Sequence, residues 1–198
     1  MQPRNKSKAE VRIEERDGCP VIVKDYGAVG NPLLRAYGIL TLRNEARIYQ
    51  RLRGIPGIPV CRGLTHARLE LSLVPGKRLA LYKRNSVPET VLADLKSIIQ
   101  AMHDRGVGMM DLHRSNVLVA QDGWSVHVID FAHAVMARDP LRPGMLARLA
   151  MRLDWHAFQR MQSHYTGCGK KAPEGAFGLL YRLLRTVKHT IRVLKRIV

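Results

Sequence analysis

Residues 109–116 read MMDLHRSN, and the interpretation of the whole chain depends on this stretch. It contains an acidic residue, Asp111, and an amide residue five positions later, Asn116. Apolar residues at helical spacing precede the stretch, and a β-like segment follows it. Taken alone, such residues are typical of a loop that caps a helix and turns the chain. Their role therefore depends on what the neighbouring segments bring to them.

A β-hairpin is predicted directly after this stretch. Strands over 117–120 and 124–129 flank an Asp-Gly turn signal, so we expect them to pair in antiparallel fashion. Asn116 lies just before the first strand, and Asp130 lies just after the second. Both residues are therefore at the open end of the hairpin, and the loop that carries Asp111 leads to the same end. The sequence predicts that two carboxylates and an amide converge there.

Oxygen ligands of this kind suit Mg²⁺, which uses few protein ligands and shares the phosphates of its substrate. We therefore predict that Asn116 and Asp130 bind Mg²⁺. Asp111 is then available to orient an attacking hydroxyl group and to accept its proton.

The motifs around these residues resemble, in the same order, those of the protein-kinase-like superfamily. DLHRSN and VIDFAH match the catalytic loop and the metal-binding segment of that superfamily. The stretch VIVK resembles the strand whose lysine binds the ATP phosphates, which is Lys24 here, at the end of a hairpin predicted over 11–24. In RNEARIYQRL, Glu45 stands where the superfamily has the glutamate that pairs with this lysine.

A hinge between two lobes is implied by LELSLVPGKRL, at 69–79. By the same resemblance, the backbone at Ser72, Leu73 and Val74 would bind adenine. His113 and Arg114 are candidate contacts to the acceptor or to the transferring phosphate, because arginine binds phosphate through two parallel hydrogen bonds.

Compact members of the superfamily are the most similar, namely the bacterial kinases of lipopolysaccharide-core sugars (Kdo and heptose kinases) and the RIO-type kinases. The resemblance implies an α+β, two-lobed protein-kinase-like fold. We expect a basic arm over 1–10, a reduced N-lobe of a sheet and one helix over 11–74, and a small helical C-lobe over 75–198.

The resemblance also implies an ATP- and Mg²⁺-dependent phosphotransferase that acts on a hydroxyl group. Little chain follows Asp130, and no segment similar to the substrate platform of protein kinases is evident. This favours a lipid-linked sugar, such as that of the lipopolysaccharide core, as the acceptor. A serine or threonine hydroxyl of a protein is the alternative.

Departures from the family pattern keep a non-catalytic alternative open. Met109 occupies the position where the family usually has histidine, and Ala132 replaces the glycine of the metal-binding segment. Gly18 is the only glycine before Lys24, so no glycine-rich phosphate loop precedes this lysine. A pseudokinase that acts as a binding module would account for these features.

The net charge of +17 predicts an anionic partner, such as nucleic acid, an anionic membrane or a phosphorylated substrate. Only 6% of the residues are aromatic, which disfavours single-strand stacking, and we expect no specific nucleic acid partner. No apolar run is long enough to span a bilayer, no signal peptide is evident, and the three cysteines are scattered. We therefore expect a cytoplasmic protein.

The C-terminal region, 143–198, is predicted to be helical. Within it, 179–198 combines an apolar stripe with many basic residues, which is typical either of a helix on an anionic membrane surface or of a solvated C-lobe helix. On the first reading the protein would be peripheral on the inner face of the cytoplasmic membrane. The apolar stripe consists of Leu180, Leu183, Leu184, Val187, Ile191 and Leu194.

Two further helices are predicted from apolar spacing and stop signals. One runs over about 40–53, after a glycine-rich loop over 27–40. The other runs over 88–105, with Ser86 and Glu89 forming a capping box.

Overall fold

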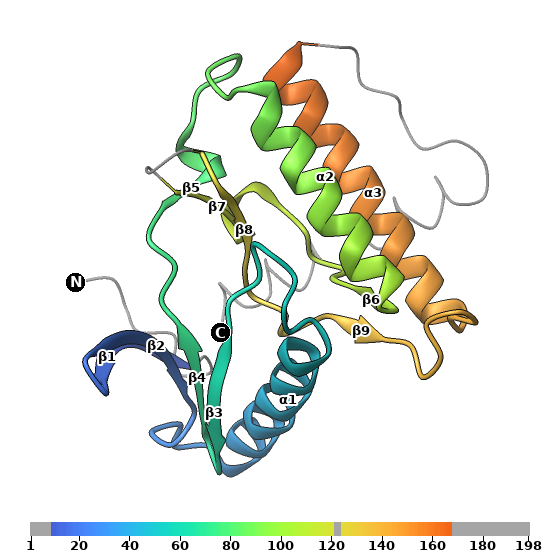
Figure 1. The fold of residues 1–198 in the computed structure, drawn as a ribbon. Helices are drawn as coiled ribbons and strands as arrows, with labels where there is room; N and C mark the ends of the chain where they lie inside the picture. Colours follow the sequence, from blue (N-terminus) through green and yellow to red (C-terminus); the bar gives the residue numbers. More distant parts are fainter. Residues whose placement is uncertain (1–8, 121–123, 168–198) are drawn as a thin grey trace, which may run out of the picture.

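A four-stranded antiparallel sheet and one long helix form the first half of the molecule (Figure 1). The structure is a computed structural model, and it describes residues 9–120 and 124–167. The strand order in the sheet is β1-β2-β4-β3, and α1 packs against β3 and β4. The elements are β1 (Glu10–Arg16), β2 (Cys19–Asp25), α1 (Pro32–Arg51), β3 (Cys61–Thr65) and β4 (Arg68–Ser72).

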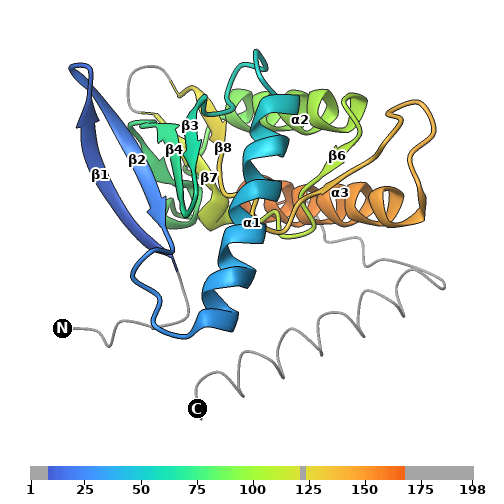
Figure 2. The same ribbon diagram turned by 90° about the horizontal axis from the view of Figure 1, so that it is seen from below.

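The second half is mainly helical, with α2 and α3 side by side (Figures 1 and 2). A small sheet in the order β5-β7-β8 lies between these helices and the first half, and β6 pairs with β9. The elements are β5 (Lys77–Arg78), α2 (Glu89–Asp104), β6 (Val107–Gly108), β7 (Val117–Val119), β8 (Val126–Val128), β9 (Val135–Met136) and α3 (Met145–Thr166), with single 3₁₀ turns at Leu79–Leu81 and Arg114–Asn116.

The predicted N-terminal hairpin is confirmed. β1 and β2 pair antiparallel, with Val11 opposite Lys24 and Arg16 opposite Cys19. The connecting residues, Asp17 and Gly18, both have positive φ angles, of 51° and 72°. A two-residue turn of this kind matches the twist of the strands and favours aspartate followed by glycine.

The first helix begins at Pro32, so the prediction that it starts near residue 40 is wrong, and so is the glycine-rich loop beyond Asn31. The Asn31 side chain accepts hydrogen bonds from the backbone N–H groups of Leu33 and Leu34, at 3.0 and 3.2 Å. Asparagine at the cap followed by proline is a favoured way to start a helix. The helix ends at Arg51, close to the predicted end.

Gly38 explains why the sequence suggested a loop at this place. A glycine inside a helix weakens it, so Gly38 contributes to the glycine-rich composition that predicts a loop over 27–40. Here the helix backbone lies directly against the ring of Tyr26, and a Cβ atom at Gly38 would meet that ring at 2.1 Å. Tertiary packing therefore requires the glycine that local propensity disfavours.

The second predicted helix is confirmed, but its capping box is wrong. The cap residue of α2 is Pro88, with no side-chain cap hydrogen bond. The Ser86 hydroxyl donates instead to the Lys83 carbonyl, at 2.9 Å, so it belongs to the preceding turn. The predicted apolar stripe of this helix is buried throughout, and consists of Val91, Leu92, Leu95, Ile98, Ile99 and Met102.

The hairpin after the opening stretch is confirmed by the pairing of β7 with β8, in which Val117 lies opposite Val128. Its turn at 121–123 lies outside the described residues. The Ile129 N–H donates to the Asn116 carbonyl at 2.9 Å, so the two ends of the hairpin lie next to each other as predicted.

The predicted helical C-terminal region is confirmed as far as α3, which is followed by Gly167 with a left-handed backbone. The amphipathic segment 179–198 and most of the basic arm lie outside the described residues. Within the described part, none of the helices combines the length and apolar character needed to cross a membrane. The predicted domain limits remain predictions.

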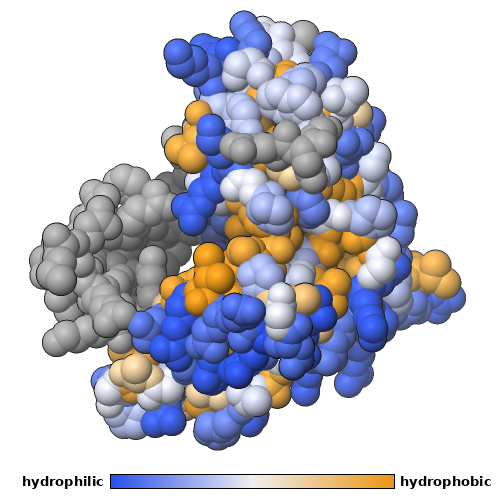
Figure 3. All heavy atoms as spheres, turned by 60° about the vertical axis from the view of Figure 1, so that its left-hand side comes forward, coloured by the Kyte–Doolittle hydropathy of each residue, from blue (hydrophilic) through white to orange (hydrophobic). Residues whose placement is uncertain are grey.

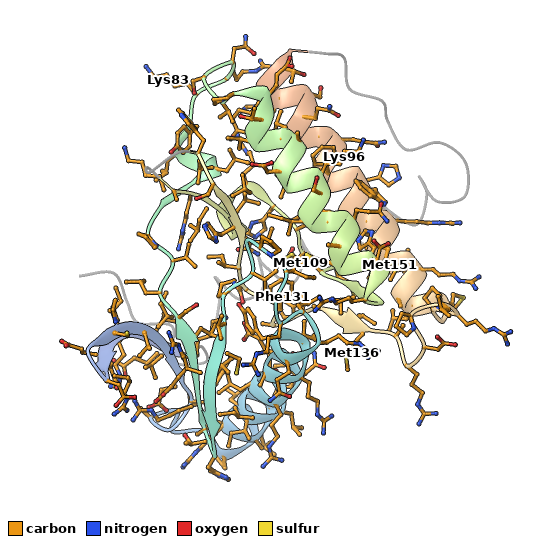
Figure 4. All side chains as sticks on the ribbon, viewed as in Figure 1. Lys83, Lys96, Met109, Phe131, Met136 and Met151 are labelled. Carbon is orange, nitrogen blue, oxygen red and sulfur yellow. The ribbon has the colours of Figure 1, made fainter. Side chains whose placement is uncertain are left out.

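One hydrophobic core runs through both halves of the molecule. Leu42 and Tyr49 of α1 belong to it, as do Leu95 of α2 and Phe158 of α3. Met109 and Phe131, which come from the two loops of the predicted site, lie in its interior (Figure 4). The loops that carry polar residues are thus anchored by apolar neighbours.

Candidate active site

Lys24 lies at the centre of a group of three charged side chains. Its Nζ atom is 2.6 Å from Oε1 of Glu45 and 2.9 Å from Oδ1 of Asp130. The Glu45 side chain is 1% exposed and that of Lys24 is 16% exposed. The structure therefore brings together a predicted phosphate-binding lysine, its predicted partner and a predicted metal ligand.

Alternation along β2 places the lysine. Val21 and Val23 are buried, whereas Ile22 and Lys24 both line a cleft, because neighbouring residues of a strand point to opposite faces. Glu45 lies on the buried face of α1, one turn before Tyr49, so the helix carries the carboxylate to the sheet.

The charges of this group shift its pKa values. Burial lowers the pKa of Lys24, but the carboxylates of Glu45 and Asp130 outweigh it, and the net shift is upward. Burial is the main cause that raises the pKa of Glu45, opposed by the charge of Lys24. For Asp130, burial is again opposed by Lys24, and here the lysine prevails and lowers the pKa. Lys24 and Asp130 are therefore an ion pair at neutral pH.

Residues that the sequence did not single out hold Asp130 in place. Its backbone N–H donates to the Tyr49 hydroxyl at 3.3 Å, and the N–H of Phe131 donates to Glu45 at 3.2 Å. The rings of Tyr49 and Phe131 pack edge to face, with centroids 5.0 Å apart. Asp130 has a φ of +68°, and a non-glycine residue keeps such a backbone only where its surroundings impose it.

The loop at 109–116 is held by a hydrogen bond from one of its side chains to its own backbone. The Asn116 side-chain amide donates to the Asp111 carbonyl at 3.2 Å, which fixes the distance between the two predicted site residues. Met110, just before the aspartate, has a φ of +61°. The Asp111 side chain is 39% exposed, with Oδ2 at 3.9 Å from Nε2 of His113.

Asp154 of α3 anchors this loop, and it is not among the site residues predicted from the sequence. Its Oδ2 atom accepts a 2.7 Å hydrogen bond from the Met109 N–H and lies 3.1 Å from Nε2 of His103. The aspartate is 0% exposed. A buried carboxylate on another helix thus holds the loop at Met109.

A signal for Asp154 was present in the sequence. It is the only acidic residue in α3, and it interrupts an apolar stripe at helical spacing. A charged residue on a buried helix face needs partners, so its position indicates a polar contact inside the core. The residues of the stripe are Ala147, Ala150, Ala157, Phe158 and Met161.

A cleft of 510 Å³ runs between the sheet of the first half and the β5-β7-β8 sheet. Figure 3 shows hydrophobic residues gathered across the middle of one face, between more hydrophilic parts above and below. Asp111 and Leu73 are not among the residues that line the cleft. Its polar and charged lining residues are Lys24, Ser72, Arg78, His113, Ser115, Asn116 and Asp130, and its apolar ones include Ile22, Leu71, Val74, Leu118 and Ile129.

Part of the backbone at the predicted hinge forms hydrogen bonds within the protein. The N–H of Ser72 donates to the Val60 carbonyl at 2.8 Å, and the N–H of Leu73 donates to the Pro20 carbonyl at 3.3 Å. Two of the three N–H groups at the predicted hinge are therefore used within the fold, and Ser72 and Val74 line the cleft.

The two predicted phosphate or acceptor contacts diverge. His113 lines the cleft. The Arg114 guanidinium lies 2.8 Å from Nε2 of His164 on α3, and Arg114 is not among the cleft residues. Of the two, only His113 is placed toward the cleft.

Comparisons with known proteins identify the fold. No protein-family model matches the chain, and no curated protein matches it in sequence. Solved structures do match, among them the Rio2 kinase of Chaetomium thermophilum, with a TM-score of 0.64 and 16% sequence identity over 87% of this chain. The chain has a protein-kinase-like fold.

A second matching structure is a complex of the same Rio2 kinase with ADP, Mg²⁺ and phosphoaspartate, also with a TM-score of 0.64 and 16% identity, over 86% of this chain. The chain spans somewhat more than half of these kinases, 56% and 58% of their length. The expected α+β, two-lobed kinase-like architecture is confirmed by this similarity. The branch within the superfamily, lipopolysaccharide-core kinase or RIO-type kinase, remains a prediction.

Proposed function

We propose that the protein is an ATP- and Mg²⁺-dependent phosphotransferase that phosphorylates a hydroxyl group. One observation carries the proposal. Lys24, paired with the buried Glu45, meets Asp130 at a cleft that Asn116 also lines. A cation, an ionised carboxylate and an amide around one cleft are the groups that phosphoryl transfer from ATP requires.

The residues of the cleft fit a bound magnesium nucleotide. Asn116 and Asp130 would hold Mg²⁺ through an amide and a carboxylate oxygen, which is the ligand type that this ion prefers. Among the described residues, no three His, Cys, Asp or Glu side chains gather into a metal site. A magnesium ion that shares the nucleotide phosphates needs no such cage. Mg²⁺ would neutralise charge on the phosphates, Lys24 would bind them, and the backbone at 72–74 would contact adenine.

Asp111 would orient the acceptor hydroxyl and take its proton. The hydrogen bond from the Asn116 amide to the Asp111 carbonyl fixes the loop, and Asp154 also holds the loop by accepting a hydrogen bond from the Met109 N–H. The carboxylate is partly exposed, so an acceptor can reach it. His113 lines the cleft beside it and is the stronger of the two candidate acceptor contacts.

For the acceptor we propose a lipid-linked sugar, such as that of the lipopolysaccharide core. The net charge of +17 favours an anionic acceptor, and Arg78 adds a cation to the lining of the cleft. A cytoplasmic protein at the inner face of the membrane would meet such an acceptor. A transfer assay with radiolabelled ATP would compare lipopolysaccharide-core acceptors with casein, and labelling of casein alone would contradict this choice.

The catalytic assignment is tested with Asp111→Ala and Asp130→Ala. We expect each to reduce phosphate transfer by at least about 100-fold, because one removes the proton acceptor and the other a metal ligand. The matched control is Asp94→Ala, an exposed aspartate on α2, which should transfer at the wild-type rate. Circular dichroism should show the same fold in all of them. Transfer at the wild-type rate by either site variant would sink the assignment.

A pseudokinase is the second candidate, favoured by the β1–β2 hairpin. That hairpin turns through Asp17 and Gly18 alone, so it offers no glycine-rich loop to cover phosphates. A ligand that binds only the folded state raises the melting temperature. We expect millimolar ATP with Mg²⁺ to raise the melting temperature of the wild type but not the melting temperature of Lys24→Met. No shift in either protein would favour the pseudokinase.

A further inference from the structure

The first turns of α1 project from the molecule. All six residues from Pro32 to Tyr37 are exposed, although four of them have apolar or aromatic side chains besides the proline. Leu33 is 80% exposed, and Tyr37 and Leu40 are each 62% exposed. Single exposed apolar residues are common, but a group of large ones on a helix end marks a surface that contacts something else.

Leu33, Tyr37 and Leu40 lie on one face of the helix. Their spacing of four and three residues places them one above another, and we call them the outer stripe. The buried face of the same helix, with Leu42 and Glu45, points the other way, into the core. The outer stripe is therefore not an extension of the core, and no described residue buries it.

On α1, the exposed charged residues are all basic, namely Arg35, Arg43 and Arg47. At helical spacing, Arg43 and Arg47 lie beside the outer stripe, whereas Arg35 lies on the other side of the helix. Glu45 is the only acidic residue of α1, and at 1% exposure it contributes nothing to the surface. This helix thus shows its surroundings apolar and cationic groups, and no accessible carboxylate.

We propose that the outer stripe docks on an anionic lipid bilayer. The acyl and headgroup boundary of such a membrane takes up leucine side chains, while its phosphates attract the arginines beside them. Tyrosine is favoured at this boundary because its ring is apolar and its hydroxyl group stays hydrated. The proposal rests on the exposure and charge of α1 and does not depend on phosphoryl transfer in the cleft.

Charge also decides between a membrane and other partners for this face. The segment 179–198 has an apolar stripe of its own, but it is rich in lysine and arginine and would bring like charges against Arg43 and Arg47. A second copy of the chain would face the same arginines with its own. A partner that is apolar and negatively charged would match both the outer stripe and the arginines beside it.

The test is sedimentation of the full chain with vesicles of phosphatidylcholine containing phosphatidylglycerol, compared with pure phosphatidylcholine. We expect binding to the anionic vesicles only. Leu33→Ser/Tyr37→Ser/Leu40→Ser should weaken the partition by about 30-fold or more, because three large side chains no longer enter the boundary. Replacing each arginine beside the stripe by glutamine should weaken it by about fivefold.

The matched control replaces three other exposed apolar residues, Leu141, Met145 and Leu146, by serine. They are 91%, 88% and 55% exposed, but lie before and at the start of α3, away from the start of α1 in Figures 1 and 2. We expect this variant to bind like the wild type. All the substituted residues are exposed, so melting temperatures should change little.

A further variant separates the outer stripe from the C-terminal segment by replacing the basic residues of that segment with glutamine. If the stripe docks, the serine substitutions in the stripe still weaken binding in this background. The proposal is overturned if the stripe variant binds the anionic vesicles like the wild type, or if the control variant loses as much vesicle binding as the stripe variant. It is also overturned if the wild type binds neutral and anionic vesicles equally, or if the protein forms a dimer without lipid that the stripe variant abolishes. The basic residues replaced are Arg182, Arg185, Lys188, Arg192, Lys195 and Arg196.

Discussion

At the scale of single residues, Asp154 shows how the site keeps its shape. It is fully buried, and one of its oxygen atoms contacts both the Met109 N–H and the His103 ring. Burial is the main cause that raises the pKa of Asp154, opposed by its hydrogen bonds with His103 and with the backbone of Met109. A buried carboxylate therefore holds the loop before Asp111.

Asp154→Ala should lower the free energy of unfolding by about 3 kcal/mol, because it leaves the buried Met109 N–H and His103 without their acceptor. Asp154→Asn should cost less, since an amide oxygen can still accept from Met109. Urea denaturation measures both. Asp94→Ala, on the exposed face of α2, should stay within about 0.5 kcal/mol of the wild type. A similarly small effect of Asp154→Ala would show that the contact is not an anchor.

At the scale of elements, α1 connects the sheet, the cleft and the exposed outer stripe. Asn31 starts the helix, and Gly38 lets it pass close to Tyr26 at the end of β2. Farther along, Glu45 reaches Lys24, and Tyr49 reaches Asp130. The path of this one helix therefore sets the distance between the lysine and its carboxylate.

Gly38→Ala should destabilise the protein by about 1–2 kcal/mol, because the new methyl group pushes against the Tyr26 ring. Alanine would otherwise stabilise a helix by roughly 0.5–1 kcal/mol. In a Tyr26→Ala background, the same substitution should become neutral or stabilising. Gly30→Ala is the control, because no atom lies within 4 Å of its Cβ position. Chemical denaturation of the wild type, the two single variants and the double variant measures these changes in the free energy of unfolding. If Gly38→Ala still destabilises the protein in the Tyr26→Ala background, the packing explanation is contradicted.

At the scale of the whole molecule, a few polar contacts join the two halves around the cleft. Lys24 of the sheet meets Asp130 of the second half. Asn44 of α1 donates to the Ala134 carbonyl at 3.1 Å, and Arg51 donates to the Ala137 carbonyl at 3.3 Å. Together with the shared core, these contacts position the phosphate-binding lysine against the metal-binding loop.

The pH dependence of stability should report the Lys24–Asp130 contact. The pKa of Asp130 is lowered by Lys24 in the folded protein, so its ion pair stabilises the fold above the ordinary carboxyl pKa, near 3.8, and this stabilisation is lost as the pH falls through the lowered value. We expect Asp130→Asn to melt below the wild type at neutral pH. The difference should close in acid, below about pH 4.

Melting temperatures measured from neutral pH into acid would show this convergence. Asp94→Asn is the control and should follow the wild-type curve throughout. Parallel curves for Asp130→Asn and the wild type across the acid range would mean that the ion pair does not contribute to stability.

Patterns within the sequence specify the local elements of the site and their order. The turn at Asp17 and Gly18, the apolar stripe of α2 and the hairpin between Asn116 and Asp130 follow from patterns within a few residues. Such patterns act through backbone preferences and side-chain periodicity, so they can be read without knowing the rest of the chain.

Which distant residues support the site depends instead on how the elements pack against one another. The glycine at position 38 within α1 is explained by its contact with Tyr26, and the anchoring of Met109 depended on Asp154, which is far away in the sequence. Contacts between elements follow from how the helices and sheets pack, and packing tolerates what local propensity disfavours, such as a glycine within a helix or a carboxylate in the core. The chemistry of the loop could therefore be predicted from its residues, whereas its support is a property of the folded molecule.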